Sequence, residues 1–182
     1  AIIHAIDYEN IRHNAVYGYT PKLKPGLILP FGAEKEFFSE KDAQEFGSLY
    51  DPEKSRLILK KAGYSWGSDG MLIDPSGKKI RTLFATCPAG WTDWESTIKI
   101  VVEGLRAIGV DVQEKFLSYE QWDRDLKNGM FDFSMKNPHP EQSYSLPWAR
   151  FDRVMSSKDL RPVGEVMYHN EGRYRNPLAD SL

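Results

Sequence analysis

The chain has 182 residues, of which 41% are hydrophobic, and its formal net charge at pH 7 is −2. This length and hydrophobic share are enough for a buried core, whereas the near-neutral charge excludes the electrostatic footprint of a nucleic-acid-binding protein. No apolar run approaches the roughly 18 residues of a membrane-spanning helix. The single cysteine, Cys87, excludes an internal disulfide, and we expect it to be a small buried residue.

Apolar residues recur with helical spacing from the first residues onward, which predicts a helix over residues 2–17 that ends before Gly18. The chain closes on NPLADSL, where Asn176 can cap a helix and Pro177 can occupy its first turn. Because both ends resemble helices that are cut short, we expect the sequence to be a piece of a longer protein.

The next segments contain clear turn and helix signals. A Pro- and Gly-rich stretch at residues 18–33 predicts a long ordered loop, and a short helix is expected near residues 41–46. In DPEKSRLILKKAGY, Asp51 is placed to cap a helix and Gly63 to end it. Turn residues between positions 69 and 77 flank short apolar runs, which indicates a hairpin.

The central part of the chain alternates strand-like and helix-like runs. The predicted strands cover residues 80–86, 110–116 and 130–135, and the predicted helices cover residues 92–108 and 118–129. This alternation is typical of an α/β fold with some parallel pairing, so we expect a mixed sheet flanked by helices. A polar and aromatic tail follows, in which a short helix is expected at residues 146–155. No repeat or linker divides the chain, and we expect residues 1–182 to form one α/β lobe.

No pattern in the sequence points to catalysis or to a metal site. There is no GxSxG, HExxH, Walker or GxGxxG motif, and the four histidines do not fall at metal-ligand spacings. Acidic pairs such as Asp123/Asp125 and Asp93/Glu95 could be assigned as acid and base, but such pairs are far commoner on exposed helix faces. We therefore expect no enzymatic activity, no metal and no cofactor.

Aromatic and polar residues follow two predicted strands, at the ends where open α/β sheets bind ligands. The first turn is CPAGWTDW, and the second is KNPHPEQSYSLPW. An aromatic ring beside hydrogen-bonding groups suits a sugar, because its C–H face packs on the ring and its hydroxyls need partners. The predicted ligand-binding residues are Trp91, Thr92, Asp93 and Trp94 on the first turn and Asn137, His139, Tyr144 and Trp148 on the second.

Packing onto the sheet is the alternative for the two tryptophans of the first turn. Trp94 lies inside the predicted helix, where packing and ligand contact remain equally open. Trp91 lies in the turn itself, and we expect it to face a cleft. Trp66 and Trp122 are interpreted as packing residues.

Several segments, taken in order, resemble one family of transport proteins. These segments are AIDYENI, YDPEKSRLILKKAGY, DGMLIDPSGKKI, GLRAIGVDVQEKFLSYEQWDRDLKNGMFDFSM and NEGRYRNPLADSL. Together they resemble the peptide- and oligosaccharide-binding proteins of bacterial ABC importers, the extracellular solute-binding proteins of family 5. The resemblance spans nearly the whole chain, and it implies two α/β lobes that close on a ligand, with this chain forming most of the second lobe.

The resemblance also bears on the ligand. Peptide-binding relatives place an acidic residue soon after the strand equivalent to FDFSM, whereas here Glu141 is the only acid in KNPHPEQSYS and the expected GW is missing. The PAGWTDW turn resembles the branch that binds β-linked oligosaccharides of the cellobiose type. This implies capture of β-linked oligosaccharides in an interlobe cleft. The alternatives are an oligopeptide-binding protein on the same scaffold, a glycoside hydrolase fragment and an interaction module.

Partners and location follow from the same resemblance. It implies a small-molecule oligosaccharide or peptide ligand and the membrane permease of an ABC transporter, with no nucleic acid. We expect a monomer in the periplasm or outside the cell, associated with the membrane through the transporter or through a lipid anchor outside this fragment.

Overall fold

The computed structural model describes residues 1–21, 28–47, 49–137 and 147–181. The chain divides into two compact units that alternate along the sequence. The first unit comprises Ala1–Leu23, Ser48–Ser118 and Asp132–Met135, and the second comprises Lys24–Gly47, Tyr119–Phe131 and Lys136–Leu182. The chain therefore returns to each unit more than once, and no single linker separates them.

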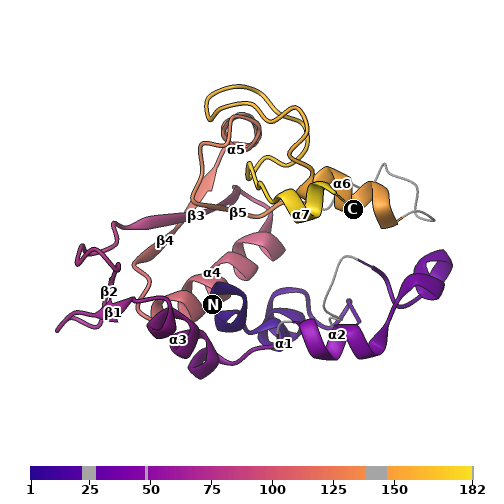
Figure 1. Ribbon diagram of the computed structural model, residues 1–182. Helices are drawn as coiled ribbons and strands as arrows, with labels where there is room; N and C mark the ends of the chain where they lie inside the picture. Colours follow the sequence, from indigo (N-terminus) through magenta and orange to yellow (C-terminus); the bar gives the residue numbers. More distant parts are fainter. Residues whose placement is uncertain (22–27, 48, 138–146, 182) are drawn as a thin grey trace. The chain divides into compact units, whose positions relative to one another are not determined.

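A parallel sheet in the order β4-β3-β5 organises the first unit (Figure 1). Its strands are β3 (Leu83–Pro88), β4 (Val112–Leu117) and β5 (Phe133–Ser134). Because all of the pairing in this sheet is parallel, the carboxyl ends of the strands meet at one edge. Helix α4 (Thr92–Ala107) connects β3 to β4 as the crossover of a βαβ unit. The expected α/β class is confirmed.

The core of the first unit lies between α4 and the sheet. On the helix, Ile98, Val102 and Leu105 are buried at the spacing of one apolar face, as the sequence pattern predicts. The N-terminal segment packs equally closely on this helix. A Cβ atom added to Gly104 would lie 2.1 Å from the carbonyl oxygen of Ala5, so only glycine allows this approach.

The predicted continuous helix over residues 2–17 is wrong. The structure contains a 3₁₀ turn η1 (Ile2–Ala5), a short helix α1 (Tyr8–Asn10) and a π-helical turn η2 (Ile11–Ala15). Ile6 is extended, and the Asp7 carboxylate then accepts a hydrogen bond from the amide of Asn10 at 2.9 Å. Asp7 thus caps a new helical start where the apolar spacing alone predicted continuity.

Helix α3 (Pro52–Lys61) confirms its sequence signals, because Asp51 accepts a hydrogen bond from the amide of Lys54 at 2.8 Å. The expected hairpin is also present, as β1 (Ser65–Trp66) paired antiparallel with β2 (Leu72–Ile73) in a sheet of its own. The Trp66 indole donates to the carbonyl oxygen of Ile108 at 2.8 Å, which ties the hairpin to the end of α4. The predicted packing role of Trp66 is confirmed.

The second unit is mainly helical in its described part. It contains η3 (Gly32–Phe37), α2 (Glu40–Phe46), α5 (Tyr119–Lys127), α6 (Pro147–Met155) and α7 (Pro177–Asp180). The short helices expected near residues 41–46 and 146–155 are therefore confirmed, although Leu146 lies outside the described residues. Trp122 is buried on α5, as predicted for a packing residue. No helix in the described part of the chain is long and apolar enough to cross a membrane.

Candidate functional site

The turn between β3 and α4 is fixed at both ends, at the carboxyl edge of the parallel sheet. The amide of Ala89 donates to the carbonyl oxygen of Leu117 at 2.6 Å, which ties the turn to β4. The amide of Gly90 donates to the Glu95 carboxylate at 2.7 Å, which ties the turn to the first turn of α4. Gly90 has a φ of +84°, a conformation that favours glycine. The backbone that carries Trp91 is therefore held in place by its own unit.

Trp91 occupies the N-cap position of α4, and its side chain makes no capping hydrogen bond. Ser, Thr, Asp and Asn are the residues preferred there, and such a cap stabilises a helix by about 1 kcal/mol. The chain instead places a tryptophan there whose surface is 38% exposed. A residue that breaks a local stability rule at the ligand edge of an α/β sheet is typical of a functional position.

Trp94 packs in the core beneath Trp91. It is only 8% exposed, and the two ring centroids lie 4.7 Å apart at an interplanar angle of 73°, an edge-to-face arrangement. The structure thus shows packing, the alternative that the sequence left open for Trp94. Trp94 orients the ring of Trp91, and the ligand contact predicted for Trp91 stays a prediction.

Thr92 and Asp93 are exposed in the first turn of α4. Their carbonyl oxygens accept hydrogen bonds from the hydroxyls of Ser96 and Thr97 at 2.7 and 2.8 Å. Their side chains point to the surface beside Trp91, where a hydroxyl and a carboxylate can bind polar groups.

Cys87, near the end of β3, is buried. Its burial, together with nearby carboxylates, raises the pKa of the thiol to about 11, so that this thiol is protonated at neutral pH.

Of the other predicted ligand-binding residues, the two that the structure describes belong to the second unit. Asn137 is exposed, and Trp148, near the start of α6, is 65% exposed. His139 and Tyr144 lie outside the described residues. The structure thus groups Trp91, Trp94 and their neighbours in one unit and Asn137 and Trp148 in the other.

A buried ion pair that the sequence did not reveal anchors helix α6. The Arg150 guanidinium donates to both carboxylate oxygens of Glu34, at 3.0 Å for Nη1–Oε2, and the amide of Leu29 donates to Oε2 at 2.8 Å. Glu34 is 1% exposed. The hydrogen bonds from Arg150 hold the pKa of Glu34 below its usual range, although burial opposes this shift. The partners lie 116 positions apart, so no local pattern could pair them.

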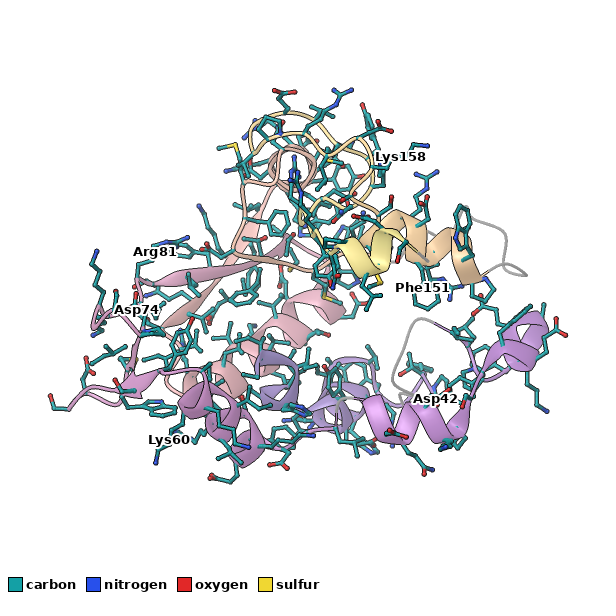
Figure 2. All side chains as sticks on the ribbon, viewed as in Figure 1. Asp42, Lys60, Asp74, Arg81, Phe151 and Lys158 are labelled. Carbon is teal, nitrogen blue, oxygen red and sulfur yellow. The ribbon has the colours of Figure 1, made fainter. Side chains whose placement is uncertain are left out.

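Two cavities of the second unit share the exposed Trp148 as a lining residue. Their volumes are about 370 and 810 Å³, within the range of small-molecule sites. Figure 2 labels Phe151 on α6, which lines the smaller cavity, and Lys158 beyond the end of that helix, which lines the larger. Among the described residues, no group of three or more His, Cys, Asp or Glu side chains is placed to hold a metal ion.

Comparison with known proteins gives a family match over most of the chain. The family model described as "Bacterial extracellular solute-binding proteins, family 5 Middle" matches residues 1–159. A curated relative, a probable peptide ABC transporter periplasmic-binding protein from Sinorhizobium fredii, is 29% identical over 113 residues. That match covers 62% of this chain and 18% of the relative.

Solved structures agree with this match. The chain is similar to a periplasmic oligopeptide-binding protein of an oligopeptide ABC transporter from Thermotoga maritima, solved with mannohexaose bound, with a TM-score of 0.88 and 30% identity. It also shares the fold of the oligopeptide-binding protein AppA from Bacillus subtilis, solved with a nonapeptide, with a TM-score of 0.71 and 20% identity. In both comparisons 99% of this chain is covered, and the chain spans 33% of the length of the other protein.

Proposed function

We propose, since this chain belongs to the bacterial extracellular solute-binding proteins of family 5, that it forms part of the substrate-binding component of an ABC importer. In this proposal, residues 1–182 form most of one lobe of a two-lobed protein that closes on its ligand and then docks on the membrane permease. The proposed function is binding without chemistry, outside the cytoplasmic membrane and as a monomer.

The observation that carries this proposal to a site is the exposed Trp91 at the carboxyl edge of the parallel sheet. Its backbone is tied to β4 and α4, and its ring packs edge-on against the buried Trp94. A preorganised aromatic surface of this kind loses little conformational entropy when a ligand covers it. Thr92 and Asp93 would supply polar contacts beside it.

An oligopeptide is the ligand class that the relatives' names favour. The curated relative is named for peptide transport, and one similar structure holds a nonapeptide. A peptide presents apolar and aromatic side chains that can pack on Trp91, and backbone amides that can bind Asp93 and Thr92.

A β-linked oligosaccharide is the second candidate, and one specific observation favours it. The Thermotoga maritima protein, named as an oligopeptide-binding protein, was solved with mannohexaose, and it is 30% identical to this chain. The exposed ring of Trp91 also suits the C–H face of a sugar. The name of a relative therefore does not decide between the two ligand classes for this chain.

A thermal-shift panel on the whole protein, including the sequence that flanks these 182 residues, tests the proposal. Oligopeptides and cello- and manno-oligosaccharides are compared, because a ligand at about 100 times its Kd adds roughly 2.7 kcal/mol to the free energy of unfolding. Stabilisation by one class identifies the ligand. No stabilisation by any member of either class would contradict the proposal.

Trp91→Ala is then expected to weaken the ligand that was found by more than about 1 kcal/mol, as an aromatic contact residue does. Phe84→Ala is the matched control, because Phe84 is an aromatic residue of the same unit with a similar exposure of 37%. Calorimetry should show a large loss for Trp91→Ala and an unchanged affinity for Phe84→Ala. If the two variants bind the ligand with equal affinity, Trp91 is not part of the binding site.

A further inference from the structure

The smaller cavity of the second unit combines apolar walls with carboxylates. It has a volume of about 370 Å³ and lies between α6 and α7. Trp148, Phe151 and Met155 supply most of its apolar lining, and Asp152 and Asp180 supply its charged groups. This composition differs from that of a packing defect in a core, which is lined by apolar atoms alone.

Helix α6 carries most of this lining on one face. Trp148, Asp152 and Met155 follow each other at spacings of four and three residues, which places their side chains along one side of the helix. A ligand group that lies along this face meets the indole ring, the carboxylate and the thioether in turn.

The opposite wall is tied to the same helix. The amide and the hydroxyl of Ser157, just beyond α6, both donate to the Asp180 carboxylate on α7, and the amide bond measures 2.7 Å. The buried Asn170 adds a second connection, because its side-chain amide donates to the carbonyl oxygen of Ser156, just beyond α6, and to that of Tyr174, before α7, both at 2.8 Å. The two walls are therefore held together by the unit itself, and the cavity is formed before any ligand binds.

The charges that line this cavity are of one sign. Among the described residues that line it, Asp152 and Asp180 are the only ionisable ones. The Asp180 carboxylate accepts hydrogen bonds from Ser157 and is also stabilised by the charge of Arg175. The Asp152 carboxylate receives no hydrogen bond or ion pair from any described residue. Arg153, Lys158 and His169 line the larger cavity and not the smaller one, although Asp152 and Asp180 line both. A positively charged occupant is the one that this lining complements.

We propose that the cavity between α6 and α7 binds a guanidinium group on an apolar stem, as an arginine side chain presents it. The planar guanidinium stacks on the Trp148 ring and forms paired hydrogen bonds with the Asp152 carboxylate. The aliphatic stem packs against Phe151 and Met155. The source that we assign is a basic side chain of the transported peptide, so this assignment rests on the proposed function in its oligopeptide form.

A matched pair of probes tests the cavity directly on the whole protein. N-acetyl-L-arginine methylamide carries the guanidinium, and the corresponding citrulline compound has the same shape without the charge. Calorimetric titration is expected to show saturable binding of the arginine probe and binding at least about tenfold weaker for the citrulline probe, the scale of one charge-assisted hydrogen bond. Equal affinities for the two probes, or no saturable binding of the arginine probe, would overturn the proposal.

Variants locate the binding. Asp152→Asn should weaken the arginine probe about tenfold and leave the citrulline probe unchanged, whereas Asp159→Asn, a matched change in the larger cavity only, should alter neither. If Asp152→Asn impairs folding, the salt dependence of the wild-type protein still tests whether the arginine probe is bound through an ion pair. The affinity of the arginine probe should fall as NaCl rises from about 0.05 to 0.5 M, and a flat response would contradict an ion pair.

These experiments distinguish a failure of the cavity assignment from a failure of the proposed function. A peptide without basic residues should stabilise the whole protein even if the cavity binds nothing, and in that case the importer function stands and the cavity assignment fails. Binding of the arginine probe with no response to any peptide or oligosaccharide would leave the guanidinium site intact, but it would overturn the importer function and with it the peptide as the source of the guanidinium.

Discussion

The turn that carries Trp91 and the helix that carries Trp148 are held in place by different forces. Around Trp91, backbone hydrogen bonds and the buried Trp94 ring fix the geometry, and no buried ion pair takes part among the described contacts. Around Trp148, the Arg150–Glu34 pair anchors the helix from a distant segment of the chain. Apolar packing is indifferent to protonation, whereas a buried carboxylate pair is not. The two regions should therefore respond differently to the same perturbation.

The largest expected effect comes from breaking the Arg150–Glu34 pair. Glu34→Ala removes the carboxylate that binds the largely buried Arg150 guanidinium, which costs about 3 kcal/mol in the free energy of unfolding. Denaturant titration measures this loss. Asp69→Ala, which breaks an exposed pair with Lys79, is the control and should leave the midpoint nearly unchanged. Similar losses in the two variants would show that the pair does not anchor α6.

A steric change tests the first unit in the same way. Gly104→Ala should destabilise the protein by about 2 kcal/mol, because the new methyl group overlaps the carbonyl oxygen of Ala5. In an exposed helix the same change would stabilise by roughly 1 kcal/mol, so the sign itself is informative. Glu103→Ala, at the exposed neighbouring position of α4, is the control. A stabilised Gly104→Ala protein would contradict the close approach.

An effect of intermediate size is expected at low pH, which should destabilise the region around Trp148 more than the region around Trp91. The folded-state pKa of Glu34 lies below its ordinary value of 4.5, so the pair contributes its full stabilisation above that value. This stabilisation is lost as the pH falls through the lower, folded-state pKa. Between about pH 4.5 and pH 2, the melting temperature of the wild type should fall more steeply than that of Glu34→Gln. Parallel pH profiles for the two proteins would refute this linkage.

The smallest expected effect concerns Cys87, beneath the Trp91 turn. Its thiol is fully buried and its pKa is raised to about 11, so a thiol reagent at pH 8 should leave the native protein almost unlabelled. Full labelling in guanidinium chloride is the positive control. Rapid labelling without denaturant would show that the turn opens readily, and that the first unit is less rigid than its packing indicates.

Features with local signals were predictable from the sequence. The cap at Asp51, the apolar face of α4 and the turn that carries Trp91 all depend on residues within a few positions of one another. The strand expected from residue 80 begins instead at Leu83, because the amide of Ile80 donates to Leu72 of the hairpin. The apolar pattern of residues 80–86 cannot show which of them pair with the hairpin and which pair with the parallel sheet.

The sequence could not predict features that depend on distant partners. The Arg150–Glu34 pair joins positions far apart in the chain, and the walls of the α6–α7 cavity are joined by bonds such as those between Ser157 and Asp180, 23 positions apart. Whether Trp94 packs in the core or contacts a ligand could not be predicted for a related reason. Its helical position allows either packing or exposure, and only the fold decides which face of α4 meets the sheet.

The place of β5 in the sequence has a consequence for the newly made chain. β5 covers one edge of β3, and its neighbour Asp132 accepts a hydrogen bond from the amide of Phe84 at 2.9 Å. Phe133, the first residue of β5, is synthesised 45 positions after Pro88, the last residue of β3 (133 − 88). At about 5–20 residues per second, that edge stays unpaired on the ribosome for roughly two to nine seconds. During this interval it can pair with another nascent strand, so the rate of translation between β3 and β5 should influence how much protein folds and how much aggregates.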